Sequence, residues 1–266
     1  MNGGGPGGGR SLSILARALD EHCAALAGCR RCGQDVGPAL PIVAEARTPR
    51  VMLVGQAPGK TEAVDRRPFA GRAGKTLFRW LAQAGIDEAR ARERIYIGAV
   101  TRCYPGPSPS GRGDRVPSPR EQALCAGWLE RELAIIRPGL IIPVGRLAID
   151  RFLDPAPLDR LVGRAHSVVH AGGSSLAIPL PHPSGASSWV HEAGHRTLLD
   201  QALALLGAAL AELGVTGVDE VGLGGPPQQH DADAPDSADR LIAERSNLSR
   251  VAPSPDRGAV GARSVA

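Results

Sequence analysis

Four cysteines are the side chains of this sequence with the clearest capacity for chemistry. Cys29 and Cys32 are spaced C-x2-C, and Cys103 and Cys125 follow much later, at the two ends of a segment rich in Pro, Gly and Ser. Four thiolates are enough to complete the coordination of a zinc ion or to hold an iron–sulfur cluster. We interpret them as metal ligands that tie an N-terminal arm to a distant part of the fold. The alternative is that the four are unrelated buried thiols. For the fifth cysteine, Cys23, we expect a buried free thiol.

Composition and charge narrow the protein class. The chain has 266 residues and 42% hydrophobic residues, enough for one sizeable domain or two small ones. No apolar run approaches the roughly 18 residues that span a membrane, and the glycine-rich start lacks the apolar core of a signal peptide. We therefore expect a cytoplasmic protein, where metal ligation is favoured over disulfides. The net charge is +4, yet residues 207–266 hold nine acids against five Arg. A basic body with an acidic tail suits nucleic acid, although a biased composition on a solvated surface would look the same.

Hydrophobic periodicity indicates alternating strands and helices. Four short apolar runs predict buried strands at residues 51–56, 94–100, 139–145 and 174–181. Helical spacing predicts helices at residues 11–27, 75–84, 120–136, 146–152 and 194–213. This alternation predicts an α/β fold, a three-layer α/β/α sandwich around a four-stranded parallel sheet. We expect a disordered glycine-rich arm at residues 1–10, one domain at 11–213, and a disordered tail at 214–266.

In such a fold, the loops at the carboxyl ends of the strands form the ligand crevice. Four segments should therefore share one rim of the domain. They are residues 55–59 (GQAPG), the loop after Cys103, Gly145-Arg146, and residues 182–184 (HPS).

Two other short patterns resemble motifs of other enzyme classes, but neither matches its motif well. Residues 69–76 resemble a phosphate-binding loop, but they have Phe69 where that loop needs glycine, and no strand precedes them. HEAGH at residues 191–195 matches a zinc peptidase motif, but Gly194 weakens the required helix and no third ligand is nearby.

Residues 55–74, GQAPGKTEAVDRRPFAGRAG, resemble motif A of the uracil-DNA glycosylase superfamily. The nearest pattern is that of its iron–sulfur (family 4) branch, GEAPG-x-x-E followed by PFVGRAG. HPS at residues 182–184 resembles the start of motif B, and the four cysteines fall where that branch holds a [4Fe–4S] cluster. The residues in register are Gly55, Ala57, Pro58, Gly59, Glu62, Pro68, Phe69, Gly71, Ala73 and Gly74.

The resemblance implies roles for individual residues. Phe69 would stack on a base extruded from DNA, and His182 would donate a hydrogen bond to the base oxygen on which charge develops. Gly55, Gln56 and Ala57 would bring backbone close to the base and to the attacking water, with Glu62 assisting. Cys29, Cys32, Cys103 and Cys125 would bind the cluster, with zinc as the alternative metal.

The sequence also departs from the family pattern. Gln56 replaces a Glu, so this side chain can orient a water but cannot take its proton. Ala99 occupies the position of an Asn that reads uracil. The segment after HPS lacks the Leu-Arg wedge, and the long loop after Cys103 lacks the His of covalently trapping relatives. In that loop, Arg112 and Arg115 are candidate contacts to DNA, as is Ser184 in HPS; a solvated loop is the alternative for the arginines.

These observations predict a monomeric, cytoplasmic, nucleoid-associated DNA glycosylase of base excision repair that acts on uracil or another deaminated base. A glycosylase-fold protein that binds DNA or damaged bases without cutting them is the alternative, because of Gln56 and Ala99.

Overall fold

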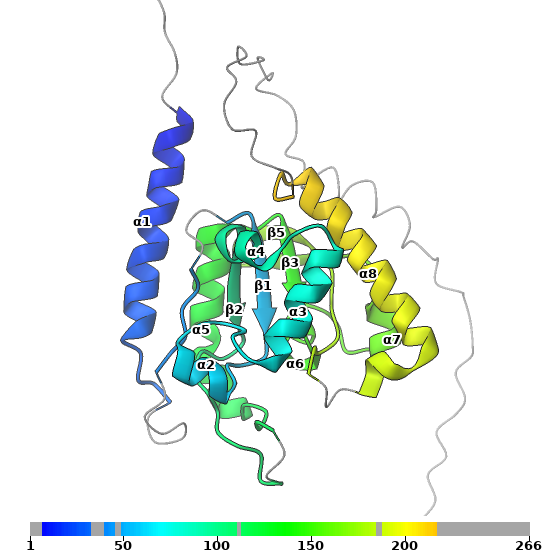
Figure 1. The fold of residues 1–266 in the computed structure, drawn as a ribbon. Coiled ribbons are helices and arrows are strands. Elements are labelled where there is room, and N and C mark those ends of the chain that lie inside the picture. The colour runs from blue at the N-terminus through cyan, green and yellow to red at the C-terminus, as the bar shows by residue number, and fades with distance from the viewer. Residues whose placement is uncertain (1–6, 33–39, 46–48, 111–112, 185–187, 217–266) are drawn as a thin grey trace, which may run out of the picture.

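The computed structural model describes residues 7–32, 40–45, 49–110, 113–184 and 188–216. Its centre is a five-stranded sheet with the strand order β2-β1-β3-β5-β4 (Figure 1). The strands are β1 (Val51–Gly55), β2 (Ile95–Ala99), β3 (Leu140–Pro143), β4 (His166–His170) and β5 (Gly173–Ala177).

The four strands expected from the sequence are present, and β2, β1, β3 and β5 run parallel to one another. The expectation of a purely parallel, four-stranded sheet was wrong in one respect. A fifth strand, β4, pairs antiparallel with β5, with His166 opposite Ala177 and His170 opposite Gly173. This strand escaped the sequence pattern because Val168 is its one buried residue, while Val169 is 84% exposed.

Helices cover both faces of the sheet, which confirms the α/β class and the three layers (Figure 1). The helices α1 and α5 lie on one face, and α3 and α8 lie on the other. The helices are α1 (Gly7–Ala27), α2 (Lys60–Asp65), α3 (Arg72–Gln83), α4 (Glu88–Arg94), α5 (Pro119–Ile136), α6 (Arg146–Ile149), α7 (Leu158–Leu161) and α8 (Ala193–Glu212). A 3-10 turn, η2, spans Ser188–His191.

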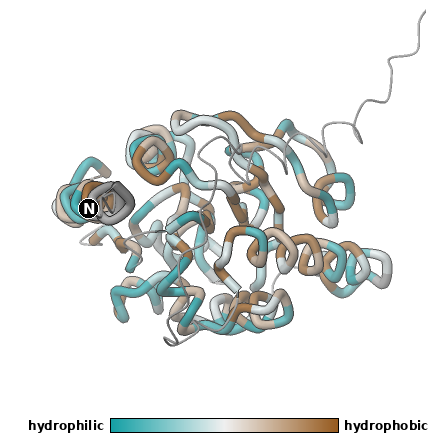
Figure 2. The backbone as a smooth tube through the Cα atoms, turned by 90° about the horizontal axis from the view of Figure 1, so that it is seen from above, coloured by the Kyte–Doolittle hydropathy of each residue, from teal (hydrophilic) through white to brown (hydrophobic). Residues whose placement is uncertain are grey.

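Alternation along the strands divides the core into two clusters. In β1, Met52 and Val54 pack with Leu19 of α1 and Leu129 of α5. Leu53, pointing the other way, packs with residues of α3 and α8. Figure 2 views this arrangement from above, with α1 seen end-on at the side marked N. Because β1 is buried along its whole length, its sequence reads as a continuous apolar run.

The predicted element boundaries agree within a few residues. The first helix begins at Gly7, inside the segment expected to be a disordered arm. Residues 1–6 and 217–266, which hold the rest of that arm and nearly all of the expected tail, lie outside the described residues. In the part of the chain that is described, no helix is long and apolar enough to cross a membrane.

One buried charge network connects these layers. Glu132 of α5 is fully buried, and its carboxylate accepts hydrogen bonds from Tyr96 of β2 (2.7 Å) and from His22 of α1 (3.2 Å). The guanidinium of Arg102, which is also fully buried, forms an ion pair with the same carboxylate. Burial and the negative charge of Glu132 both raise the pKa of Tyr96, so its hydroxyl remains a donor. The network holds α1, α5 and the end of β2 in one arrangement.

We predict that Glu132→Gln destabilises the protein by about 3 kcal/mol, because it leaves the charge of Arg102 buried without its counter-ion. Urea unfolding at neutral pH measures this change. Glu130→Gln is the matched control: Glu130 lies on the same helix, but its ion pair with Arg151 is exposed, so we expect a change below about 1 kcal/mol. Equal stability of the two variants would contradict the role assigned to the network.

Candidate active site

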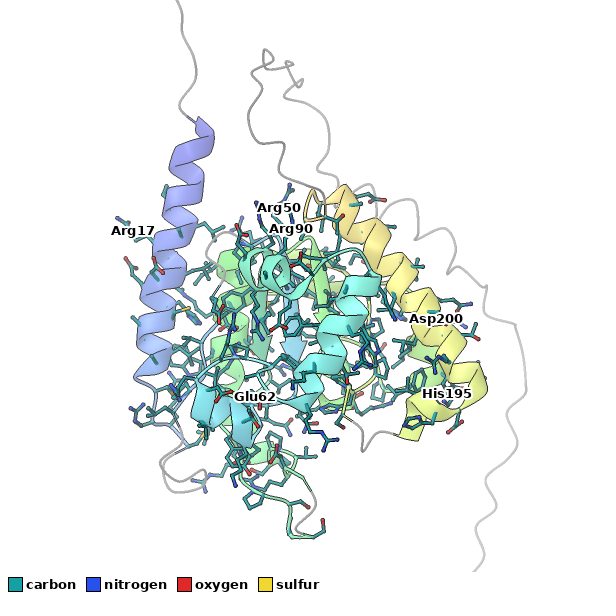
Figure 3. All side chains as sticks on the ribbon, viewed as in Figure 1. Arg17, Arg50, Glu62, Arg90, His195 and Asp200 are labelled. Carbon is teal, nitrogen blue, oxygen red and sulfur yellow. The ribbon has the colours of Figure 1, made fainter. Side chains whose placement is uncertain are left out.

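A cavity of about 710 Å³ opens at the carboxyl ends of β1, β2 and β3. Three of the four segments predicted to share this rim contribute to its wall: the turn after β1, the loop after Cys103 and the HPS segment. The fourth, Gly145-Arg146, is not among the described lining residues, although Gly145 lies against His182. Figure 3 shows Glu62 at this end of the molecule, and Arg50, which precedes β1, at the opposite end. The lining includes Gly55, Gln56, Ala57, Phe69, Ala99, Asp114, Arg115, His182 and Ser184.

The ring of Phe69 lies directly over Gly55. A Cβ atom on residue 55 would come within 2.9 Å of ring atom Cζ and 3.1 Å of Cε2. Only glycine therefore allows the ring to sit this close to the end of β1. One face of the cavity is thus an aromatic surface, of the kind on which a planar base can stack.

The backbone of Phe69 has a left-handed conformation, with φ of 51°, which is uncommon for an aromatic residue. Two neighbours keep it there. The buried guanidinium of Arg92 donates hydrogen bonds to the carbonyl oxygens of Pro68 (2.8 Å) and Phe69 (3.3 Å). Gly74 lies against the same carbonyl, since a Cβ on residue 74 would be 1.8 Å from the Phe69 oxygen. The position of the ring is thus set from beneath by α3 and α4.

His182 has a defined tautomer in this arrangement. Its Nδ1 accepts a hydrogen bond from the backbone N–H of Ser184 (3.2 Å) and lies 2.9 Å from the Ser184 hydroxyl oxygen. Since Nδ1 is an acceptor, the proton of the neutral ring is on Nε2. Burial lowers the pKa of His182, so the neutral form prevails at neutral pH. The ring also lies against Gly145, where a Cβ would be 2.8 Å from Cδ2.

Glu62 is buried, and both of its carboxylate oxygens accept hydrogen bonds from backbone N–H groups. One carboxylate oxygen accepts the N–H of Gly59 (3.0 Å), and the other accepts the N–H of Gly71 (2.9 Å). The side chain thereby joins the turn at residues 55–59 to the segment that carries Phe69. The geometry shows Glu62 as a residue that positions the cavity wall.

Gln56 and Ala99 lie side by side at the end of the sheet. Gly55 pairs with Ala99 in the register of β1 and β2, and the backbone N–H of Thr101 donates to the carbonyl oxygen of Gln56 (3.2 Å). Ala99 is buried and lines the cavity. At this position the cavity presents a methyl group in place of a hydrogen-bonding side chain.

The candidate DNA contacts have different surroundings. Arg115 forms a two-pronged ion pair with Glu121, at 2.6 and 2.7 Å, which lowers the pKa of Glu121 to about 2. Ser184 lines the cavity and supports His182. Arg112 lies outside the described residues.

The four candidate metal ligands come from three segments of the chain, and their thiols lie near enough to affect one another electrostatically. Burial, together with the nearby thiols of Cys32, Cys125 and Cys29, raises the pKa of Cys103 to about 12. Arg102 opposes this effect at Cys125, through its charge and through a backbone hydrogen bond to the thiol. Cys23 lies apart from this group, buried 4.0 Å from the Tyr96 hydroxyl.

Within the described residues, no three His, Cys, Asp or Glu side chains stand in the arrangement of a closed metal site. The four thiols are nevertheless close enough to influence one another's ionisation. Four thiolates placed together repel one another, and a cationic metal centre removes that repulsion. The donor set therefore has the chemistry that a [4Fe–4S] cluster or a zinc ion requires.

HEAGH does not form a zinc peptidase helix. The helix α8 begins at Ala193, after His191, and the ring of His195 stacks on Trp189 with a centroid distance of 4.2 Å. The Nδ1 atom of His195 is also hydrogen-bonded to the carbonyl oxygen of Trp189 (3.0 Å). Figure 3 shows His195 at the start of α8.

Comparison with known proteins agrees with this geometry. Residues 43–207 match the family model of the uracil DNA glycosylase superfamily. The chain belongs to this superfamily. It is 33% identical to a Type-4 uracil-DNA glycosylase of Thermotoga maritima, over 59% of this chain and 76% of that protein. It is 31% identical to a Type-4 uracil-DNA glycosylase of Archaeoglobus fulgidus, over 63% of this chain and 82% of that protein.

A third relative extends the comparison within the uracil-DNA glycosylase superfamily. The chain is 32% identical to a Type-5 uracil-DNA glycosylase of Thermus thermophilus, over 39% of this chain and 49% of that protein. The resemblance found in motif A is thus confirmed at the level of the superfamily. Nothing in the sequence indicated the roles of Arg92 and Arg102 at the candidate site of this chain, because a single arginine in a helix or loop carries no signal of its buried partners.

We predict that Gly74→Ala displaces Phe69 and destabilises the protein by about 2 kcal/mol, because its Cβ would overlap the Phe69 carbonyl. Gly127→Ala is the matched control, also within a helix, where the nearest atom to a new Cβ is 4.0 Å away. It should be neutral or slightly stabilising, since alanine favours helix. Thermal unfolding of both variants tests this, and an unchanged melting temperature for Gly74→Ala would contradict it.

Proposed function

We propose that this DNA glycosylase hydrolyses the N-glycosidic bond of uracil, or of another deaminated base, in DNA during base excision repair. The observation that carries the proposal is the cavity that unites Phe69, His182 and the turn at residues 55–59. The names of the superfamily relatives support the same reaction. We further propose that the protein acts as a cytoplasmic, nucleoid-associated monomer.

A glycosylase reaches the bond only after the nucleotide has left the base stack. The ring of Phe69 offers the extruded base an aromatic face, held rigid by Gly55 below and by Arg92 behind. A cavity of about 710 Å³ is large enough for one base and the water that attacks its sugar. Stacking of a base on an aromatic ring contributes about 1–3 kcal/mol.

Bond cleavage leaves negative charge on the base and positive charge on the sugar. The Nε2–H of His182 is the donor that we assign to the base oxygen. The hydrogen bond from Ser184 to Nδ1 fixes the ring orientation that this role needs. A neutral donor already held in place stabilises the developing charge without reorganising in the transition state.

The turn at residues 55–59 places its backbone and the Gln56 side-chain amide in the wall of the cavity. Gln56 can orient the attacking water through its amide, and Gly55 and Ala57 leave room for substrate. We assign Glu62 to holding this turn, since both of its oxygens accept backbone N–H groups. Ala99 offers no hydrogen bond to the base edge, which favours tolerance among deaminated bases.

Several cations surround the cavity mouth and suit the phosphates of DNA. Lys60 and Arg72 are exposed and line the cavity, and Arg115 borders it from the loop after Cys103. We propose that they track the backbone on both sides of the extruded nucleotide. Ser184 would contact the same strand through the HPS segment.

We propose that Cys29, Cys32, Cys103 and Cys125 hold a [4Fe–4S] cluster, with zinc as the alternative. The mutual influence of the thiols on their ionisation supports a shared site. Bound there, the group supplies a covalent link between the α1 arm and α5. The protein's own side chains around the cavity perform the hydrolysis.

We predict release of free uracil from uracil-containing single- and double-stranded oligonucleotides. Phe69→Ala and His182→Ala should each lower the rate at least about tenfold and remain folded, because they remove stacking and the oxyanion donor. Base release is measured by chromatography and alkaline strand cleavage. Tight, salt-sensitive DNA binding without release from uracil, hypoxanthine or xanthine would instead favour the non-cutting alternative.

The pH dependence tests the role of His182 separately. Its pKa lies below 6.5 because of burial, so the neutral donor persists as pH falls through 6.5 and is lost only at lower pH. We expect wild-type base release to begin falling at a lower pH than the titration of an exposed histidine would give. A rate that falls in step with an unperturbed histidine would contradict the lowered pKa of His182.

We predict that anaerobically purified protein absorbs in the visible range and contains about four iron atoms per chain. Cys103→Ser should lose iron and melt at a lower temperature, because the link between the arm and α5 is broken. Cys23→Ser is the matched control and should retain iron, since Cys23 lies beside Tyr96. A colourless protein with stoichiometric zinc would refute the cluster.

A further inference from the structure

The hydrolysis proposed above needs a group that accepts a proton from water, and the cavity offers two carboxylates among its described lining residues. They are Glu62 and Asp114. The amide of Gln56 can orient a water but cannot accept its proton. The two carboxylates differ in how their oxygens are used.

Glu62 is committed to the fold. Its two oxygens accept the backbone N–H groups of Gly59 and Gly71, and its side chain is buried within the wall. Protonating it would weaken both of these hydrogen bonds and loosen the turn that forms the site. It is therefore a poor proton acceptor for turnover.

Asp114 reaches the same turn from the opposite side. Its Oδ2 lies against Gly59, since a Cβ on residue 59 would be 2.8 Å from it and 2.7 Å from the Glu62 Oε2. The side chain is solvent-accessible at the cavity mouth and accepts a hydrogen bond from the Tyr104 hydroxyl. This carboxylate is thus held beside the turn while water can still reach it.

The segment carrying Asp114 is fastened at several points. Asp114 pairs with Pro107 in an antiparallel bridge, and the N–H of Arg115 donates to the carbonyl oxygen of Gly106 (3.1 Å). The next side chain, Arg115, is clamped to Glu121 at the start of α5. Glu121 also accepts the N–H of Ser118 (2.6 Å) within the capping box of that helix. These contacts fix Asp114 relative to the cavity.

We propose that Asp114 is a catalytic residue, the general base for the attacking water; this inference rests on the proposed function. The C1′–N bond breaks with its electron pair going to the base. The water oxygen then bonds to C1′ as one water proton passes to the Asp114 carboxylate. The base anion takes a proton from solvent, and Asp114 returns its own to solvent. Its negative charge also stabilises the positive sugar before the water adds.

The test is Asp114→Asn, which keeps an oxygen to accept from Tyr104 but cannot take a proton. On a uracil oligonucleotide in single-turnover conditions, we expect a rate at least about 100-fold below wild type. Binding of an oligonucleotide with a non-hydrolysable uracil analogue should change less than about threefold. Asp65→Asn, an exposed aspartate at the end of α2 and outside the cavity lining, should leave both quantities unchanged.

Rescue distinguishes a chemical role from a structural one. Asp114→Ala should regain at least about tenfold in rate when formate is added, because formate can accept the proton in the vacated space. Wild-type and Asp65→Asn rates should not respond to formate. An Asp114→Asn variant as fast as wild type, or an Asp114→Ala variant that formate does not rescue, overturns the assignment. A wild-type protein that releases no base contradicts the proposed function itself.

Discussion

The arrangement of this molecule depends on supplying hydrogen-bond and ion-pair partners to one carboxylate in the protein interior. Glu132 is fully buried, and Tyr96, His22 and Arg102 all donate to its carboxylate. Each donor comes from a different segment, so the charge is satisfied only when α1, α5 and the end of β2 are in place together. Arg102 then leads directly into Cys103 and also lines the cavity. A single buried ion pair thereby couples the position of the thiols to that of the site. In other proteins, replacing a whole buried ion-pair network with apolar side chains is often tolerated.

The cavity stores strain where it meets substrate. An aromatic residue with positive φ costs free energy and persists only when its surroundings determine it several times over. Here Arg92, Gly55 and Gly74 each constrain Phe69 from a different side. Two of these residues are glycines, and Phe69 lies close to each of them only because glycine has no Cβ. The motif that contains Phe69 thus serves to hold one aromatic ring in position, in addition to supplying functional groups.

Much of this could be predicted from the sequence, and the failures have common causes. Buried parallel strands such as β1 are recognisable in the sequence as apolar runs. Because the carboxyl ends of parallel strands lie at one edge of the sheet, Gly55 and His182 could be placed together. The strand β4 could not be found, because a half-exposed edge strand carries almost no apolar signal. The engagement of Glu62 and the approach of Asp114 to Gly59 depend on contacts between segments that no local pattern records.

The position of Ala99 bears on which bases such a site can distinguish. In the register of the sheet it sits opposite Gly55, so neither strand end offers a side-chain hydrogen bond to the base edge. The donors assigned above to the base and to the water are the Nε2–H of His182 and the Gln56 amide, while Lys60, Arg72, Arg115 and Ser184 also line the cavity. Donors recognise carbonyl oxygens, and deamination is the reaction that replaces an exocyclic amine of a base with a carbonyl. In the function proposed above, the site would therefore bind the carbonyl oxygens that deamination creates, without a side-chain hydrogen bond from residue 99.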